Sequence, residues 1–234
     1  MCYSLAALAL DEEPLVHVQT QVLQLILQKM HFNSKLPTAV RHGPPELGGI
    51  GLYDLRTEAG IEALKFFRNA LYSDSEPGNL IRLNLDYSQR EAGVGQALLQ
   101  YPVIHLPYLT PSWLMSLRQF LYIHNLQVQV TDTHIDQLKS SKDEYMMNNS
   151  HLQRYSAVQQ RNINLVRLYL QVVTLADMAE KARPNRIDLS FIDARRPSTF
   201  VPDPTWPRQH EPTASQRRLW KRYISSSYLR YIPY

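Results

Sequence analysis

A mainly helical fold is predicted for this chain of 234 residues. Apolar residues recur at steps of three and four over most of its length, which is the period of a helix with one buried face. Strand-like alternation is confined to residues 127–131, with residues 187–192 as the only candidate partner. We therefore expect helices, at most a short two-stranded β element, and an extended Pro-rich basic tail that ends in a helix.

The stretch around which the chain is organised is a glycine- and proline-rich loop at residues 36–55. It contains four glycines and three prolines, which favour a shaped loop over a helix. A phosphate-binding loop is disfavoured, because no Lys-Ser or Lys-Thr follows the glycines and no strand precedes them. We expect a packed connection between helices, anchored by its apolar residues Leu47, Ile50, Leu52 and Leu55.

Residues 1–100 are predicted to form a helical bundle around this loop. A first helix spans about 14–30, with acidic residues before Pro14. A second is capped by Asp54, and a third runs from about 79 to a stop at Gly93. Their expected buried positions are Leu15, Val18, Val22, Leu25 or Ile26 and Met30 in the first, Ile61, Leu64, Phe67 and Leu71 in the second, and Leu80, Leu83 and Tyr87 in the third.

Residues 101–180 are predicted to form a second helical region. Thr110-Pro111 favours a helix start, and the helical spacing of Trp113 and Phe120 indicates core positions. The polar residues 131–150 indicate a linker. A long helix is then expected from a cap at Ser156 to about residue 179, with Arg161 and Arg167 solvated by default.

The last region, residues 181–234, differs in composition from the rest. It carries a net charge of +7, whereas residues 1–180 carry −3. Its prolines disfavour regular structure over most of an arm, and Thr213 to Gln216 has the spacing of a capping box before a terminal helix. The abrupt end at residue 234 suggests a fragment of a longer protein.

A basic region interleaved with aromatic residues is what phosphate contact and base stacking require. RNA or DNA is therefore an expected partner, although a solvated arginine-rich face is an equally common interpretation. The candidate phosphate contacts are Arg195, Arg196, Arg208, Arg217, Arg218, Lys221 and Arg222. The candidate stacking residues are Trp206 and Trp220.

Nothing in the sequence supports a catalytic or metal site. No Asp-Asp pair occurs, the eight histidines lack metal-binding spacing, and the single cysteine, Cys2, has no local context of a nucleophile. We therefore name no catalytic residue, no metal ligand and no cofactor. No apolar run is long enough to span a membrane, so an intracellular location is expected, with the nucleus plausible.

Several segments resemble the thumb and downstream region of reverse transcriptases of retrotransposon type from microbial eukaryotes. The resemblance covers nearly the whole chain and is specific as a combination of motifs. The matching segments are residues 36–40 (Leu-Pro-Thr-Ala-Val), 47–52 (Leu-Gly-Gly-Ile-Gly-Leu), 108–113 (Tyr-Leu-Thr-Pro-Ser-Trp), 118–121 (Arg-Gln-Phe-Leu), 161–171 and 206–209 (Trp-Pro-Arg-Gln).

The resemblance implies a thumb-like bundle, with the catalytic palm and its metal-binding aspartates encoded before residue 1. It further implies a noncatalytic segment that contacts primer-template or element RNA, in a protein whose full-length relative is an RNA-directed DNA polymerase. The alternative is a structural or protein-interaction module, or a degenerate retroelement remnant without activity.

Overall fold

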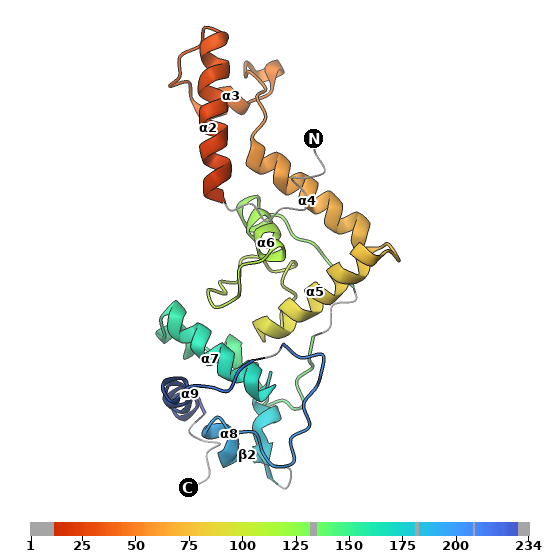
Figure 1. The fold of residues 1–234 in the computed structure, drawn as a ribbon, viewed down its shortest axis with the longest axis vertical. Coiled ribbons are helices and arrows are strands. Elements are labelled where there is room, and N and C mark those ends of the chain that lie inside the picture. The colour runs from red at the N-terminus through yellow and green to blue at the C-terminus, as the bar shows by residue number, and fades with distance from the viewer. Residues whose placement is uncertain (1–11, 132–134, 181–182, 208, 229–234) are drawn as a thin grey trace. The chain divides into compact units, whose positions relative to one another are not determined.

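The computed structural model describes residues 12–131, 135–180, 183–207 and 209–228 (Figure 1). The fold is mainly helical, as predicted, and its short antiparallel sheet joins β1 (Ala179–Glu180) to β2 (Arg183–Ile187), with Ala179 opposite Ile187. The helices are α2 (Glu12–Lys29), α3 (Thr38–His42), α4 (Leu55–Leu71), α5 (Glu76–Ala92), α6 (Trp113–Ile123), α7 (Ala157–Leu170), α8 (Leu189–Ile192) and α9 (Ala214–Ser227). Short 3-10 turns are η1 (Pro45–Leu47), η2 (Met146–Asn148), η3 (Leu152–Arg154) and η4 (Leu175–Met178).

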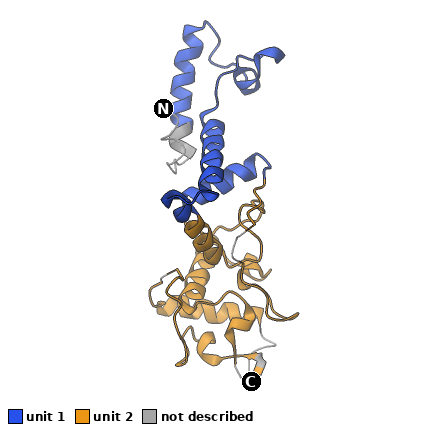
Figure 2. Ribbon diagram, turned by 90° about the vertical axis from the view of Figure 1, so that its right-hand side faces the viewer, with its two compact units in different colours: residues 1–81, 111–126 blue, residues 82–110, 127–234 orange. Residues whose placement is uncertain are grey.

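The chain divides into two compact units (Figure 2). Unit 1 comprises Met1–Ile81 and Pro111–Leu126, and unit 2 comprises Arg82–Thr110 and Gln127–Tyr234. These bounds differ from the expected divisions at residues 100 and 180. Periodicity locates helices but not their partners, so it did not group α6 with the first part of the chain.

In unit 1, α4 packs against α2 and α6. The ring of Phe67 on α4 is buried and stacks on Trp113 of α6 with centroids 6.4 Å apart. A Cβ on Gly60 would lie 2.1 Å from the ring of Phe120, so this glycine allows α6 to approach α4 closely. Trp113 and Phe120 are thus packing residues, as expected.

Helix α6 begins two residues later than predicted. Its cap is Ser112, whose hydroxyl accepts a hydrogen bond from the Met115 amide. Thr110 does not cap this helix, because its hydroxyl donates to the Glu91 carboxylate at 2.6 Å. A contact with a residue distant in the sequence, Glu91, therefore takes the place of the local cap that was predicted for Thr110.

The loop at residues 36–55 folds back on itself. The amides of Ile50 and Leu52 donate to the carbonyl oxygens of Val40 and Arg41 at 2.8 and 2.9 Å. Gly48 and Gly51 have positive φ values of 82° and 70°, which favour glycine. The prediction that Leu47 anchors the loop is wrong, since its side chain is 84% exposed.

The buried face of α2 was predicted incorrectly. Val18, Val22 and Leu25 are exposed, whereas Leu23 and Leu27 are 6% and 1% exposed. Apolar residues cover more than one stripe of this helix, so periodicity alone could not decide which stripe packs in unit 1.

The expected face of α5 is also exposed, at Leu80, Leu83 and Tyr87. A polar residue, Gln89, is buried in their place. Its side-chain amide donates to the carbonyl oxygens of Val94 and Gln96 at 3.0 Å, and its oxygen accepts from the Leu98 amide. These hydrogen bonds satisfy the amide of Gln89, so this polar side chain can be buried. A prediction that places only apolar side chains in the core therefore chose the wrong face of α5.

In unit 2, α9 packs against α7 and α8. Helix α7 ends at Leu170 and not near residue 179. Gln171 adopts a left-handed conformation with φ 56°, and the Val172 amide donates to the Arg167 carbonyl, closing the helix. Asp177 then accepts the amide of Thr174 at 2.9 Å, which starts η4.

The expected strand at residues 127–131 is absent from the structure. The Val128 amide donates to the Leu99 carbonyl at 3.0 Å, outside any ladder. The expected partner, residues 187–192, is not one strand. Ile187 is the last residue of β2, and residues 189–192 form α8, because the Asp188 carboxylate caps that helix by accepting the Ser190 amide at 2.8 Å.

The described part of the polar stretch 131–150 is tied to η4. The buried Asp143 carboxylate accepts the amide of Lys139 at 2.9 Å and that of Ala176 at 2.8 Å. An isolated bridge pairs Tyr145 with Thr174. The segment is therefore integrated into unit 2, which a polar composition does not predict.

Candidate nucleic-acid interface

The terminal helix α9 starts where the sequence predicts. The Thr213 hydroxyl accepts a hydrogen bond from the Gln216 backbone amide at 3.3 Å, and the Gln216 side-chain oxygen accepts one from the Thr213 backbone amide at 2.9 Å. The Gln216 side chain also donates to Asn162 on α7 at 3.0 Å. The capping box therefore fixes both the start of the helix and its contact with α7.

One face of α9 is buried in unit 2. The Trp220 indole is fully buried and donates to the Phe191 carbonyl at 2.7 Å. The Tyr223 hydroxyl donates to the carbonyl of Met146, and burial raises the pKa of Tyr223 well above its usual value. Ile224 completes this face. The helix is thus a core element of unit 2 and not a free arm.

The opposite face of α9 carries three exposed cations, Arg218, Lys221 and Arg222. Their spacing of three and four residues places them on one side of the helix. Lys221 forms an ion pair with Asp193 at 2.9 Å. Within the described chain, the side chains of Arg218 and Arg222 have no hydrogen bond or ion pair, so their charges are available to a ligand.

Arg217 lies at the edge of that face and is compensated within the chain. It donates to the Glu211 carboxylate and to the Pro212 carbonyl, the latter at 3.1 Å. Its guanidinium is therefore less available to phosphate than those of Arg218 and Arg222.

The adjacent pair Arg195 and Arg196 have different environments. Arg195 is exposed. Arg196 donates twice to the Tyr169 carbonyl, at 2.7 and 3.0 Å, and lies over the rings of Tyr169 and Phe200 at 4.2 and 4.9 Å. These contacts hold the half-buried Arg196 at the end of α7, so Arg195 is the more exposed of the pair.

Neither predicted stacking residue exposes a ring. Trp220 is fully buried, and Trp206 is 9% exposed and packs against Leu168 and Val173. The guanidinium of Arg90 lies 5.7 Å from the Trp206 ring. Both indoles are therefore core side chains in this structure. Arg208 lies outside the described residues.

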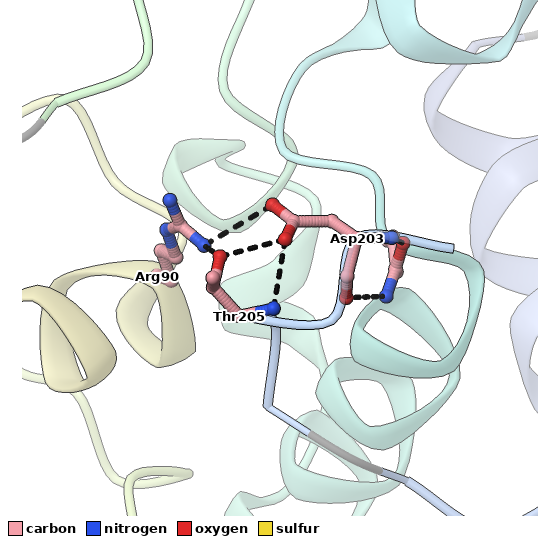
Figure 3. A network of polar contacts seen from close by, with 4 residues as sticks. Arg90, Asp203 and Thr205 are labelled. Atoms are coloured by element: carbon pink, nitrogen blue, oxygen red, sulfur yellow. Dashed lines mark hydrogen bonds and ion pairs between the residues drawn. The ribbon is translucent and has the colours of Figure 1, made fainter. Parts of the chain in front are cut away.

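Polar contacts hold the segment that carries Trp206 (Figure 3). Arg90 forms an ion pair with Asp203 at 3.3 Å and donates to the Thr205 hydroxyl at 2.7 Å. The hydrogen bonds of Thr205 are the main cause that lowers the pKa of Asp203. Gln171 adds two bonds to the backbone of Asp203, at 2.8 and 3.1 Å.

A buried arginine that the sequence analysis treated as solvated, Arg167, holds the end of α5. It is fully buried and donates to the carbonyl oxygens of Arg90 and Glu91 at 2.6 and 2.8 Å. It also donates to Asn164 and to the Val172 carbonyl. Burial lowers its pKa to about 10, so it stays charged at neutral pH. The signal in the sequence that could have indicated its burial is its position on the helix beside Val166 and Leu170, which are both buried.

Among the described residues, no three His, Cys, Asp or Glu side chains gather closely enough to hold a metal ion. The described helices include none that is long and apolar enough to cross a membrane. Comparisons with protein-family models, with curated proteins and with solved structures found no match to this chain.

Proposed function

We propose that this chain binds nucleic acid without acting on it chemically, through the outer face of α9. The observation that carries the proposal is the pairing of an exposed cationic face, Arg218, Lys221 and Arg222, with a fully buried opposite face. Because Trp220 anchors the helix in unit 2, the cations are presented by a fixed element. Fixed guanidinium groups form strong, often bidentate bonds to phosphate.

Recognition on this surface is directed at the phosphate backbone. Both candidate stacking residues are buried, so base stacking is not part of the proposal. Phosphate contacts carry no sequence information, and affinity should therefore be independent of base sequence. We propose RNA or DNA as the ligand, in keeping with the primer-template contact that the reverse transcriptase resemblance implies.

The test is fluorescence anisotropy with an RNA–DNA hybrid and with single-stranded RNA. If three phosphates are neutralised, affinity should fall about 40-fold for the duplex and about 20-fold for the single strand between roughly 50 and 200 mM salt. Replacing Arg218 and Arg222 together by Glu should abolish binding at the higher salt concentration. Arg68→Glu combined with Lys35→Glu, both at exposed positions of unit 1, makes the same change in net charge as the test variant and should have a small effect. Equal binding by the two variants, or no binding by the native chain at low salt, contradicts the proposal.

We further propose that the chain derives from a retrotransposon-type reverse transcriptase, as its noncatalytic thumb and downstream region. The motifs at residues 36–52 and 108–121 support this origin. The genomic reading frame upstream of Met1 provides the test. An aromatic-x-Asp-Asp motif encoded there is expected, and an unrelated reading frame overturns this origin while leaving the binding proposal intact.

A protein-interaction module is the second candidate function. The exposed apolar residues of α2 favour it, because they form a contiguous stripe and are not scattered singly. Partner binding that survives the Arg218 and Arg222 substitutions, in a chain that never binds nucleic acid, would favour this function over the first.

A further inference from the structure

A carboxylate lies within the proposed phosphate-binding surface. The Asp193 side chain accepts a hydrogen bond from the Lys221 ammonium at 2.9 Å. On α9, Lys221 follows Arg218 by three residues and directly precedes Arg222, and these are the two arginines whose charges are available to a ligand. The surface therefore presents two available cations and one that already has an anion of the same chain.

The fold holds Asp193 in this place. Asp193 follows α8 and lies between two buried residues, Ile192 and Ala194. The carbonyl of Phe191 accepts a hydrogen bond from the Trp220 indole at 2.7 Å, which attaches α8 to α9. The carboxylate is thus presented to α9 by a packed backbone, and it stays beside the cationic face.

The ion pair between Asp193 and Lys221 is weak enough to exchange. The side chains of Lys221 and Asp193 are 60% and 47% exposed, respectively. An exposed pair of this kind shifts an equilibrium by about five-fold at most, because water and salt screen both charges. A ligand that replaces the carboxylate on Lys221 therefore loses little affinity by doing so.

A nucleic acid can deliver a phosphate group to Lys221 in place of the carboxylate. Once Arg218 and Arg222 hold two phosphates, a neighbouring phosphate of the same strand meets Lys221 at an effective concentration on the order of millimolar. Its neutralisation also releases a counterion from the polymer, whereas the pair with Asp193 releases none. Exchange of the carboxylate for a phosphate is therefore favoured at low salt.

We propose that Asp193 competes with the ligand for Lys221, a role that rests on the proposed function of α9. In the free chain the carboxylate occupies the lysine, and in the complex a phosphate group displaces it. Asp193 is thus an affinity-limiting residue of this surface, which binds nucleic acid less tightly than its cations alone would allow.

Asp193→Asn tests the competition by fluorescence anisotropy with the RNA–DNA hybrid. The variant should bind about two- to five-fold more tightly than the native chain at equal salt, because Lys221 no longer has to leave a carboxylate. A merely structural role for Asp193 predicts the opposite sign, since loss of an anchor weakens binding. Asp86→Asn, at a partly exposed position of α5 in the same unit, makes the same change in net charge and should have a smaller effect.

An equal gain in the two variants, or no gain in Asp193→Asn, overturns the competition, and binding by the native chain then leaves the proposed function intact. If the native chain does not bind at low salt, the proposed function is wrong. Asp193→Asn still decides the role of the carboxylate in that case: binding by this variant alone supports competition for Lys221, and absence of binding contradicts it.

The salt dependence of binding tests the displacement itself. The slope of log affinity against log salt concentration should be equal for the native chain and Asp193→Asn, because Lys221 neutralises a phosphate in both complexes. A slope steeper by about 0.9 in the variant would show that Lys221 of the native chain stays on Asp193 in the complex. That result would overturn the displacement of the carboxylate by phosphate.

Discussion

The guanidinium of Arg167 lies directly against the backbone of Gly93. A Cβ on residue 93 would come within 2.6 Å of the guanidinium carbon and 2.8 Å of a terminal nitrogen. Gly93 also has a φ of 62°, in the region that glycine favours. The residue that ends α5 thus leaves the space in which Arg167 reaches the last carbonyl groups of the same helix, where the helix dipole favours a cation.

Gly93→Ala should lower the free energy of unfolding by about 3 kcal/mol. The left-handed conformation alone costs roughly 1–2 kcal/mol with a side chain, and the methyl group must also displace the buried guanidinium. Urea denaturation followed by circular dichroism provides the measurement. Gly48→Ala is the control for the conformational term, because Gly48 has a positive φ with no atom within 4 Å of the added methyl group. Equal losses in the two variants would contradict the role of the contact.

Arg167→Met should destabilise unit 2 by about 3 kcal/mol, since it removes the hydrogen bonds that a buried guanidinium donates to several carbonyl groups, of which that of Glu91 keeps a donor in Asn164. The carbonyl groups of Arg90, Glu91 and Val172 all accept bonds from this side chain. A double-mutant cycle with Gly93→Ala provides the decisive measurement. The two losses should sum to more than the loss in the double variant, and strict additivity would show that the residues act independently.

Four helix ends were predicted correctly from the sequence. Asp54, Ser156 and Thr213 cap α4, α7 and α9, and Gly93 follows the last residue of α5, as expected. At these ends the cap depends on neighbouring residues alone, whereas at the start of α6 a distant residue, Glu91, binds the predicted cap Thr110. The buried faces of α2 and α5 depend on distant segments. The side chain of Gln89, for example, became a core residue only because residues 94–98 surround it.

The sequence predicted that the tail is basic, but not which of its basic side chains are exposed. The same positive charge in the tail results whether an arginine faces solvent, as Arg218 does, or binds a carbonyl, as Arg196 does. The distinction depends on tertiary contacts, such as the end of α7 reaching Arg196. Helical periodicity in α9 did place Trp220 near Ile224, which is consistent with its burial, and the sequence alone left open whether that side stacks on bases or packs in a core.

His31→Gly should stabilise the end of α2 by about 0.5–1 kcal/mol. His31 is exposed and has a φ of 59°. The amide of the next residue, Phe32, donates to the Leu27 carbonyl at 2.8 Å, which closes the end of the helix. This arrangement closes many helices with glycine at that position, because glycine has no Cβ penalty there. Thermal unfolding measures the gain. His31→Ala removes the imidazole and keeps the Cβ, so a similar gain in that variant would attribute the effect to the histidine side chain and not to the backbone.

Stability should fall as the pH rises above about 10, in part through Tyr228. Burial raises the pKa of Tyr228 to about 12, from an ordinary value of 10.0. The unfolded chain therefore loses this proton first, and the stabilisation that is complete below pH 10 is lost as the pH approaches 12. Two pKa units correspond to about 3 kcal/mol at most. The lowered pKa of Arg167 acts in the opposite direction over part of this range, so the test must isolate the tyrosine.

The comparison of Tyr228→Phe with the native chain isolates that contribution. Phenylalanine retains the packing of the buried ring but has no ionisable hydroxyl, so the variant should lose less stability between about pH 8 and pH 11. Urea denaturation at both pH values gives the difference, while Tyr72→Phe, at a position 71% exposed, supplies the control. An identical pH dependence in the native chain and Tyr228→Phe would show that this hydroxyl titrates alike in the folded and unfolded states.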